Sequence, residues 1–343
     1  MRTEHDVPFT GLTTLRLGGP ARRLVIAESD EDVVETVRDA DHRGEPLLVL
    51  GGGSNLVVGD AGFDGRVLQL ATRGVAVAPL AEHALQVEAG VDWDHVVALT
   101  VDEGYAGIEA LSGIPGRVGA APIQNVGAYG QEVAQTVGWV RALDRSTHDV
   151  VLLDPSECGF GYRTSVFKAH PDRYVVLAVA FALEHSRDGA PIQYAELARA
   201  LGVEAGARVP ATEVRAAVLA LRRTKGMVLD PADPDTYSAG SFFTNPLLDP
   251  ADADRLPADA PRWPERDGRV KTSAAWLIEH AGFSKGYGTG PVRISTKHTL
   301  ALTNRGGATT AELLALAREV RDGVRARFDV DLVNEPVLLG DSL

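Results

Sequence analysis

Short apolar runs alternate with an amphipathic segment near the start of the chain. The stretches "RRLVIAE" (22–28) and "PLLVL" (46–50) predict two buried strands. Between them, valines at helical spacing predict a helix that is capped at Ser29 or Asp30. The second strand runs directly into "GGGSNLVV". Glycines in such a turn let backbone amides approach a phosphate, and a plain tight turn would explain the same letters equally well.

The middle of the chain has the pattern of short strands interrupted by a long loop. Between about residues 66 and 185, runs such as "GWVRALD" and "YVVLAVAFALE" alternate in polarity, which predicts a half-buried sheet. Residues 113–130, "GIPGRVGAAPIQNVGAYG", are too dense in glycine and proline for a regular element. The backbone groups of this loop must find partners elsewhere, and a ligand is one such partner.

The last third of the chain is predicted to contain three helices. The first covers residues 212–226, with Thr212 as its N-cap and Gly226 as its stop. A shorter helix follows in "TSAAWLIEHAG". The clearest helix opens with a capping box from Thr309 to Glu312. Its predicted buried face consists of Leu313, Ala317, Val320, Val324 and Phe328.

Two further segments of this region lack a helical pattern. Residues 249–268 are acidic and rich in proline, which predicts a linker on the surface. The final apolar run, "VDLVNEPVLLG", predicts a strand that carries Glu335 and is kept extended there by Pro336.

Composition narrows the class of protein. With 343 residues the chain is too long for one ordinary core, and we expect three domains. We expect neither a membrane span nor a secretory signal, because long apolar runs are lacking. The single cysteine, Cys158, cannot form an internal disulfide, which is typical of a cytoplasmic protein. No metal site is expected either, because the histidines lack ligand spacing.

The charge of the chain disfavours one class of partner. A net charge of -13 would repel the phosphate backbone of a nucleic acid. Basic residues nevertheless recur beside glycine-rich or polar segments, where they are equally consistent with a pocket for a small anion or with scattered solvated side chains. They are Arg163, Lys168, Lys225, Lys285 and Lys297.

The stretch "SAGSFFTNP" (238–246) contains a candidate proton donor, Ser241. A nucleophilic serine of the G-x-S-x-G type requires glycine two residues later, where this chain has Phe243. Ser241 is therefore better suited to proton transfer than to attack on a carbonyl. Phe242 and Phe243 could keep such a site dry, and an ordinary core role for them is equally consistent with the sequence.

Five motifs in a fixed order span almost the whole chain: "GGGSN", "GIPGRVGAAPIQNVGAYG", "GYRTSVFK", "AGSFFTNP" and "NEP". Together they resemble the UDP-N-acetylenolpyruvoylglucosamine reductases, the MurB-type flavoenzymes of peptidoglycan synthesis. The resemblance implies an α+β fold, with an FAD-binding fold of the vanillyl-alcohol-oxidase/PCMH type and a C-terminal α+β substrate domain. The expected parts are residues 1–65, completed by 330–343, then a strand-rich part at 66–210 and a substrate domain at 211–329.

The resemblance also implies a flavin site built from the two glycine-rich segments. FAD would be bound there non-covalently, with amides of the first segment around the pyrophosphate and the second segment flat against the flavin ring. The implied FAD-binding residues are Gly51, Gly52, Gly53, Ser54, Asn55, Ile114, Pro115, Gly116, Gly119, Ile123, Gln124, Asn125 and Gly127.

Three residues correspond to the catalytic residues of the family. Arg163 would stabilise the negative charge that develops on the enolpyruvyl carboxylate, since a guanidinium can bind both oxygens. Ser241 would give its proton to C2 of the enolpyruvyl group. Glu335 would also act at this centre, and we expect it to be protonated or to share a proton through water.

Other residues would hold the UDP-sugar substrate. They are Tyr194, Lys225, Asn245, Lys285 and His298. Tyr194 resembles a tyrosine on an extra loop of one subtype, and a core tyrosine that caps a helix is the alternative. The segment that follows Lys225, residues 226–237, is longer than the family pattern, which leaves the placement of Lys225 open.

The resemblance implies an NADPH-dependent reductase that is cytoplasmic, monomeric and without a nucleic-acid or membrane partner. Because one flavin face would serve NADPH and sugar nucleotide in turn, a ping-pong order is expected. Two alternatives remain: a flavin oxidase acting on an alcohol or polyol, and a nucleotide-sugar sensor without catalysis. The oxidase often carries a covalent flavin on histidine or cysteine, which both flavin segments lack.

Overall fold

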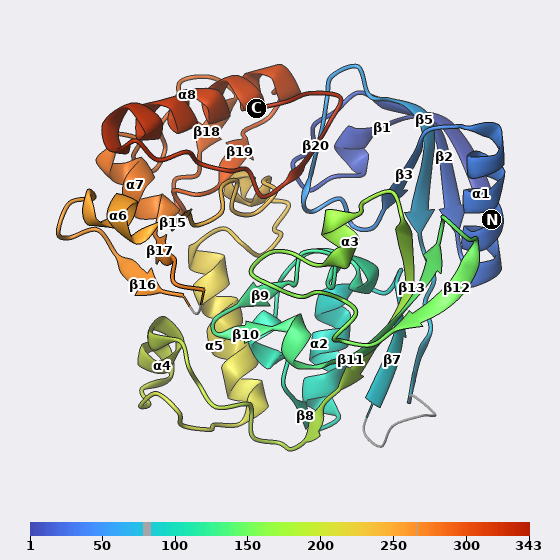
Figure 1. The fold of residues 1–343 in the computed structure, drawn as a ribbon, viewed down its shortest axis with the longest axis horizontal. Helices are drawn as coiled ribbons and strands as arrows, with labels where there is room; N and C mark the ends of the chain where they lie inside the picture. Colours follow the sequence, from blue (N-terminus) through green and yellow to red (C-terminus); the bar gives the residue numbers. More distant parts are fainter. Residues whose placement is uncertain (78–83, 266) are drawn as a thin grey trace. The chain divides into compact units, whose positions relative to one another are not determined.

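The computed structural model describes residues 1–77, 84–265 and 267–343, and Figure 1 traces their path. The chain forms two compact units, each with a hydrophobic core of its own. Unit 1 comprises Met1–Val7, Ala21–Gly52 and Asp64–Thr224, and unit 2 comprises Pro8–Pro20, Gly53–Phe63 and Lys225–Leu343. The division into three parts at residues 65 and 210 stays a prediction.

Unit 1 begins with a four-stranded sheet of order β1-β2-β5-β3. Its strands are β1 (Arg2–Pro8), β2 (Pro20–Ala27), β3 (Leu47–Leu50) and β5 (Phe63–Leu70). Helix α1 (Asp30–Arg43) lies beside this sheet (Figure 1). The predicted cap is confirmed at Ser29, whose side chain accepts a hydrogen bond of 3.1 Å from the amide of Asp32.

Strand β1 was not predicted from the sequence. It is an edge strand with mainly exposed side chains, so it lacks the apolar alternation by which strands are found. Backbone pairing with β2, rather than burial, defines it.

A second sheet of unit 1 has the order β12-β11-β13-β7-β6, with antiparallel neighbours throughout. Its strands are β6 (Val75–Val77), β7 (Ala84–Glu88), β11 (Val137–Asp144), β12 (Asp149–Leu153) and β13 (Tyr174–Ala182). The predicted half-buried alternation is wrong for the central strand β13, which is buried continuously from Val175 to Phe181. A strand covered on both faces needs apolar residues at every position.

The helices and small pairs of unit 1 complete its architecture. They are α2 (Trp93–Asp102), α3 (Val166–Ala169), α4 (Ala195–Leu201), α5 (Ala211–Thr224), β8 (Tyr105–Ala106) with β14 (Glu184–His185), and β9 (Gly127–Ala128) with β10 (Gln131–Glu132). Contrary to the prediction that no regular element fits there, the loop at 113–130 contains the short strand β9 and a 3-10 turn, η3 (Val118–Ala120).

Thr212 is not the N-cap of α5, contrary to the prediction. The carbonyl of Pro210 already accepts from the amides of Glu213 and Val214, so the cap position lies two residues earlier and the helix begins at Ala211. Gly226 follows the helix with a left-handed φ of 65°, in agreement with its predicted role as a stop.

Unit 2 combines short strands with helices, of which α8 is the longest in its described residues. Its strand groups are β4 (Leu56–Val58) parallel to β20 (Val337–Leu339), the sheet β15 (Leu247–Leu248), β17 (Val270–Thr272) and β16 (Arg262–Pro264), and the pair β18 (Val292–Ile294) and β19 (Leu302–Asn304). Its helices are α6 (Pro250–Asp254), α7 (Ala274–His280) and α8 (Thr310–Phe328).

The predicted capping box of α8 is confirmed. The amide of Thr309 donates to Oε2 of Glu312 at 2.8 Å, and the amide of Glu312 donates to Oγ1 of Thr309 at 3.2 Å. The predicted apolar face is buried, except that Phe328 is only partly buried at the end of the helix.

The predicted surface linker at 249–268 is instead a structured part of unit 2, with Arg266 lying outside the described residues. It contains α6 and β16, and Leu256 and Ala260 belong to the core. Arg262 organises it by donating to backbone carbonyls, among them that of Leu256 at 2.8 Å. Proline and acidic residues here mark tight turns around a fixed arginine rather than a free linker.

Candidate functional site

The two glycine-rich segments meet within unit 1. A Cβ added at Gly52 would lie only 2.8 Å from the Cα of Gly116, and one added at Gly51 would lie 3.4 Å from the Cβ of Arg117. At Gly52, backbone therefore packs on backbone, which only glycine permits at this distance, whereas a Cβ at Gly51 would make an ordinary contact. Gly51 and Gly52 belong to unit 1, whereas Gly53, Ser54 and Asn55 belong to unit 2.

The long loop is also fixed against the end of strand β7. The amide of Gly119 donates to the carbonyl of Ala89 at 2.9 Å, and a Cβ at Gly119 would meet the Cβ of Ala89 at 2.5 Å. The structure thus uses the Gly119 amide to anchor the loop. Ile114 packs against the core of unit 1.

Asn125 shapes the loop from inside. It is buried and has a left-handed φ of 47°. Its Nδ2 donates to Oε2 of Glu132 at 2.9 Å and to the carbonyl of Gly161 at 3.1 Å, and its Oδ1 accepts from the amide of Ala134 at 3.0 Å. Nearby, the hydroxyl of Ser165 donates to the carbonyl of Ile123 at 2.5 Å. Gln124 and Pro115 are partly buried in the same loop.

Arg163 reaches the glycine-rich loop in unit 1. Its guanidinium donates to the carbonyl of Asn125 at 3.2 Å and to that of Gly127 at 2.7 Å. Its own backbone has a φ of 52°, a left-handed conformation that costs energy for a residue other than glycine. Lys168 donates to the carbonyl of Arg163 at 2.9 Å. The ring of Tyr162 lies 5.4 Å from the Arg163 guanidinium carbon.

In unit 2 the segments that carry Ser241 and Glu335 pair with each other. The amide of Glu335 donates to the carbonyl of Phe242 at 2.8 Å, and Phe243 bridges to Asn334 in antiparallel register. Both phenylalanine rings are buried in the core of unit 2. This anchoring brings Ser241 and Glu335, both partly exposed, to neighbouring positions.

The turn at residues 53–55 is hydrogen-bonded to the same pair of segments. Nδ2 of Asn55 donates to the carbonyl of Glu335 at 3.4 Å, and the amide of Val337 donates to the carbonyl of Asn55 at 3.0 Å. Thr14, which the sequence did not single out, donates from its amide to the carbonyl of Gly53 at 3.1 Å and from its hydroxyl to that of Ser238 at 2.6 Å. No periodic signal marks Thr14, because its partners are distant in the chain.

The predicted substrate residues of unit 2 have different surroundings. Oδ1 of Asn245 accepts from the amide of Ala274, the first residue of α7, at 3.0 Å. His298 is partly buried and donates from its amide to Oγ of Ser295 at 3.3 Å. Lys285 is exposed in the loop after α7, and Lys225 is partly buried just beyond α5.

The segment 226–237 is bonded to the loop that carries His298. Lys297 pairs with Asp233 at 2.5 Å, so this lysine is already neutralised by a carboxylate. Asp235 accepts from the amide of Thr296 at 2.9 Å and from Arg305 at 2.7 Å. Burial opposes ionisation of Asp235, but these hydrogen bonds and the charge of Arg305 together lower its pKa.

Tyr194 lies on unit 1 at the N-cap position of α4, but its side chain forms no capping hydrogen bond. It is 46% exposed, so it is not a core tyrosine. Its ring packs edge-on against Tyr129 with 5.6 Å between centroids. Burial raises the pKa of Tyr129 to about 12, and burial lowers that of Arg222 to about 10. The sequence pattern alone does not single out Tyr129 or Arg222 as functional residues.

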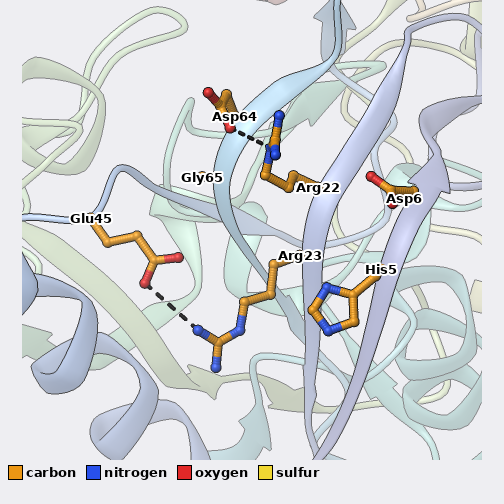
Figure 2. Close-up of a pocket in the computed structure, with 7 residues that line it drawn as sticks. All are labelled: His5, Asp6, Arg22, Arg23, Glu45, Asp64 and Gly65. Carbon is orange, nitrogen blue, oxygen red and sulfur yellow. Dashed lines mark ion pairs between the residues drawn. The ribbon is translucent and has the colours of Figure 1, made fainter.

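A hollow of about 570 Å³ lies elsewhere on unit 1, at the four-stranded sheet (Figure 2). It is lined by His5, Asp6, Arg22, Arg23, Glu45, Asp64 and Gly65, and none of these is a predicted site residue. Its arginines are paired, Arg22 with Asp64 at 2.5 Å and Arg23 with Glu45 at 3.9 Å.

Two family profiles match the chain. One, described as an FAD binding domain, matches residues 21–151. The other, described as the C-terminal domain of UDP-N-acetylenolpyruvoylglucosamine reductase, matches residues 231–339. The fold and these matches define an α+β flavoprotein in which a distinct C-terminal domain follows the FAD-binding domain, and the predicted fold class and cofactor are confirmed.

Relatives extend the similarity over the whole chain. UDP-N-acetylenolpyruvoylglucosamine reductase of Thermobifida fusca is 59% identical, covering 99% of this chain and 98% of the relative. The reductase of Streptomyces coelicolor is 60% identical, and the match covers 99% of this chain and 91% of the relative. The crystal structure of the Thermus caldophilus enzyme is 27% identical and covers 99% of both chains with a TM-score of 0.70. The chain belongs to the UDP-N-acetylenolpyruvoylglucosamine reductase family, as its motifs predicted.

Proposed function

We propose that this chain reduces the enolpyruvyl group of UDP-N-acetylglucosamine enolpyruvate to a lactyl ether, giving UDP-N-acetylmuramate for peptidoglycan synthesis. NADPH is the reductant and FAD the cofactor. The observation that carries the proposal is the full-length similarity to reductases of this name, at 59% identity over 99% of the chain. Family membership favours this activity over an alcohol oxidase or a sensor without catalysis.

The residues present fit a flavin. The close backbone approach of Gly52 to Gly116 leaves peptide groups, rather than side chains, at the meeting point of the two glycine-rich segments. Residues 51–55 would hold the pyrophosphate and the 113–130 loop the ring, since successive amides form an anion nest. Bound FAD supplies hydride transfer from NADPH to C3 of the enolpyruvyl group.

Arg163 is proposed to stabilise the substrate carboxylate as negative charge develops on it. A planar guanidinium binds two oxygens at once, and its hydrogen bonds strengthen as that charge grows. The hydrogen bonds from Arg163 to loop carbonyls support this role because they fix the position of the guanidinium within unit 1.

Ser241 is proposed to donate a proton to C2 of the substrate. An aliphatic hydroxyl is a weak acid, but a carbanion-like enolate is a strong base, so transfer is feasible in a site that excludes water. The buried rings of Phe242 and Phe243 hold Ser241 in position, and Glu335 on the paired segment is the proposed third catalytic residue.

The remaining assignments belong to the same proposal. The UDP-sugar would be held by Tyr194, Lys225, Asn245, Lys285 and His298. We place the enzyme in the cytoplasm as a monomer without a nucleic-acid or membrane partner. Among the helices within the described ranges, none has the length and apolar character needed to traverse a bilayer.

Anaerobic mixing tests the activity directly. The purified protein is reduced with one equivalent of NADPH and then mixed with the enolpyruvyl sugar nucleotide while the flavin spectrum is followed. Return of the oxidised spectrum without oxygen, with formation of UDP-N-acetylmuramate, is expected. A flavin that stays reduced until oxygen is admitted would contradict the proposal.

A further inference from the structure

Two buried side chains join the two ends of the 113–130 loop in unit 1. Glu109 lies in the 3-10 turn η2 (Glu109–Leu111) just before the loop, and Gln131 lies in β10 just after it. Their exposed fractions are 1% and 9%. Neither residue has a part in the proposed chemistry.

The side-chain amide of Gln131 forms two hydrogen bonds with the segment just before the loop. Its Nε2 donates to Oε1 of Glu109 at 2.8 Å, and its Oε1 accepts from the backbone amide of Ala110 at 2.8 Å. Both polar atoms of one side chain are therefore engaged across a gap of 20 residues. We call this pair, Glu109 and Gln131, the clasp.

The carboxylate of Glu109 connects the clasp to two further backbone segments. It accepts from the amide of Ala190 through Oε1 and from the amide of Gly107 through Oε2, each at 2.6 Å. A Cβ at Gly189 would lie 2.9 Å from Oε1, so a larger residue there would crowd the carboxylate. Protein donors thus compensate a carboxylate removed from water.

The clasp leads directly to the interior of the loop. Glu132, next to Gln131, holds the side chain of Asn125 at 2.9 Å, and the carbonyls of Asn125 and Gly127 receive the Arg163 guanidinium. A shift at Gln131 would therefore move the part of the loop proposed to face the flavin ring.

We propose that Glu109 and Gln131 are positioning residues that hold the loop in its flavin-binding shape before FAD arrives. Closing and ordering a long loop costs conformational entropy, and a loop ordered in advance does not incur this cost on binding. Loss of the clasp therefore weakens FAD binding. This inference rests on the FAD part of the proposed function and is independent of the sugar substrate.

The test is FAD affinity of the apoprotein, measured by quenching of flavin fluorescence, for Gln131→Glu, Glu109→Gln and the swapped double variant. Gln131→Glu sets two carboxylates against each other. We expect it to raise the Kd at least about tenfold, the factor that corresponds to 1.4 kcal/mol. In the double variant an amide and a carboxylate face each other again, and we expect part of the affinity to return.

Asp144→Asn is the matched control. Asp144 is also a buried carboxylate of unit 1, with 4% exposure and hydrogen bonds from Ser146 and Arg173, but it lies at the end of β11 beside the β11–β12 turn. Its variant should lower the melting temperature of the apoprotein and leave the Kd for FAD within about twofold. This separates positioning of the loop from general loss of stability.

An unchanged Kd for FAD in Gln131→Glu would overturn the proposed role of the clasp. The same conclusion would follow if Gln131→Glu and Asp144→Asn lowered the melting temperature equally and raised the Kd for FAD equally. Gln131→Met, which is uncharged and similar in size, replaces Gln131→Glu if the latter does not fold. Wild-type protein that binds FAD but does not reduce the enolpyruvyl sugar would remove the proposed function and leave the clasp standing.

Discussion

Ser241 and Glu335 depend on their neighbours for position. Phe242, between the Ser241 backbone and the core, donates its amide to the carbonyl of Leu300 at 2.7 Å and accepts from Glu335 at 2.8 Å. The residue next to the proposed proton donor is therefore fixed on both sides. A substitution at Ser241 itself removes only a small, partly exposed side chain and should leave this framework intact.

Ser241→Ala should separate the two halves of the reaction. Reduction of the flavin by NADPH should stay near the wild-type rate, because no proton at C2 is involved. Reoxidation by the enolpyruvyl sugar should slow by several orders of magnitude, since the general acid is lost. Stopped-flow absorbance of each half measures both rates, and an equal loss in the two halves would remove Ser241 as the proton donor.

Arg163→Lys tests whether the substrate carboxylate needs two N–H donors held in one plane. Lysine keeps the positive charge but loses the planar, bidentate geometry. It also gives up one of the two hydrogen bonds to the carbonyls of Asn125 and Gly127. We expect reoxidation by the sugar to fall by about 100-fold, the effect of losing one transition-state donor. Retention of the wild-type rate would show that charge alone suffices.

At the scale of elements, strand β7 and the 113–130 loop meet through glycine. The Gly119 amide bonds to Ala89 at the end of β7, and the site of a Cβ is already filled by the side chain of Ala89. The loop is thus seated on the second sheet at van der Waals contact. Any side chain at Gly119 must push the two elements apart.

Gly119→Ala should accordingly lower both stability and FAD affinity. Overpacking of a buried contact costs about 1–3 kcal/mol. Gly138→Ala is the control, because a Cβ at Gly138 of β11 would meet its nearest neighbour at an ordinary 3.6 Å. Urea unfolding and FAD titration of both variants provide the measurement. Equal effects at the two glycines would show that the seating at Gly119 is unimportant.

At the scale of the whole molecule, an acidic chain of net charge -13 keeps several carboxylates paired with arginine. The hydrogen bond from Arg173 to Asp144, the largest influence, lowers the pKa of that carboxyl to about 2. An unfolded aspartate has a pKa of about 3.9. Because the folded value is the lower one, the pair stabilises the fold above pH 4 and this contribution disappears as the pH falls toward 2.

Asp144→Asn should therefore reduce the free energy of unfolding at pH 7 by about 1–3 kcal/mol, the range for a hydrogen bond to a charged group. The difference from wild type should shrink below pH 4 and vanish near pH 2. Urea unfolding at a series of pH values measures it. A difference that stays constant down to pH 2 would assign the effect to packing rather than to charge.

The sequence pattern predicts correctly those features that depend on contacts between residues close together in the chain. The cap at Ser29, the capping box at Thr309 and Glu312, and the apolar face of α8 follow from contacts within a few residues. The ordered motifs, including those around Arg163 and Ser241, likewise carried the family and its cofactor. The caps and the helix face could be predicted because neighbouring residues alone produce them.

Contacts between distant parts of the chain needed the tertiary structure. The edge strand β1, the continuous burial of β13, the structured segment at 249–268 and the clasp of Glu109 with Gln131 all depend on such partners. A side chain shows no pattern for a partner 20 or 200 residues away, since only folding brings the two together. Residue types and short motifs therefore specify the available chemistry, and long-range contacts in the folded chain select the groups that shape the site.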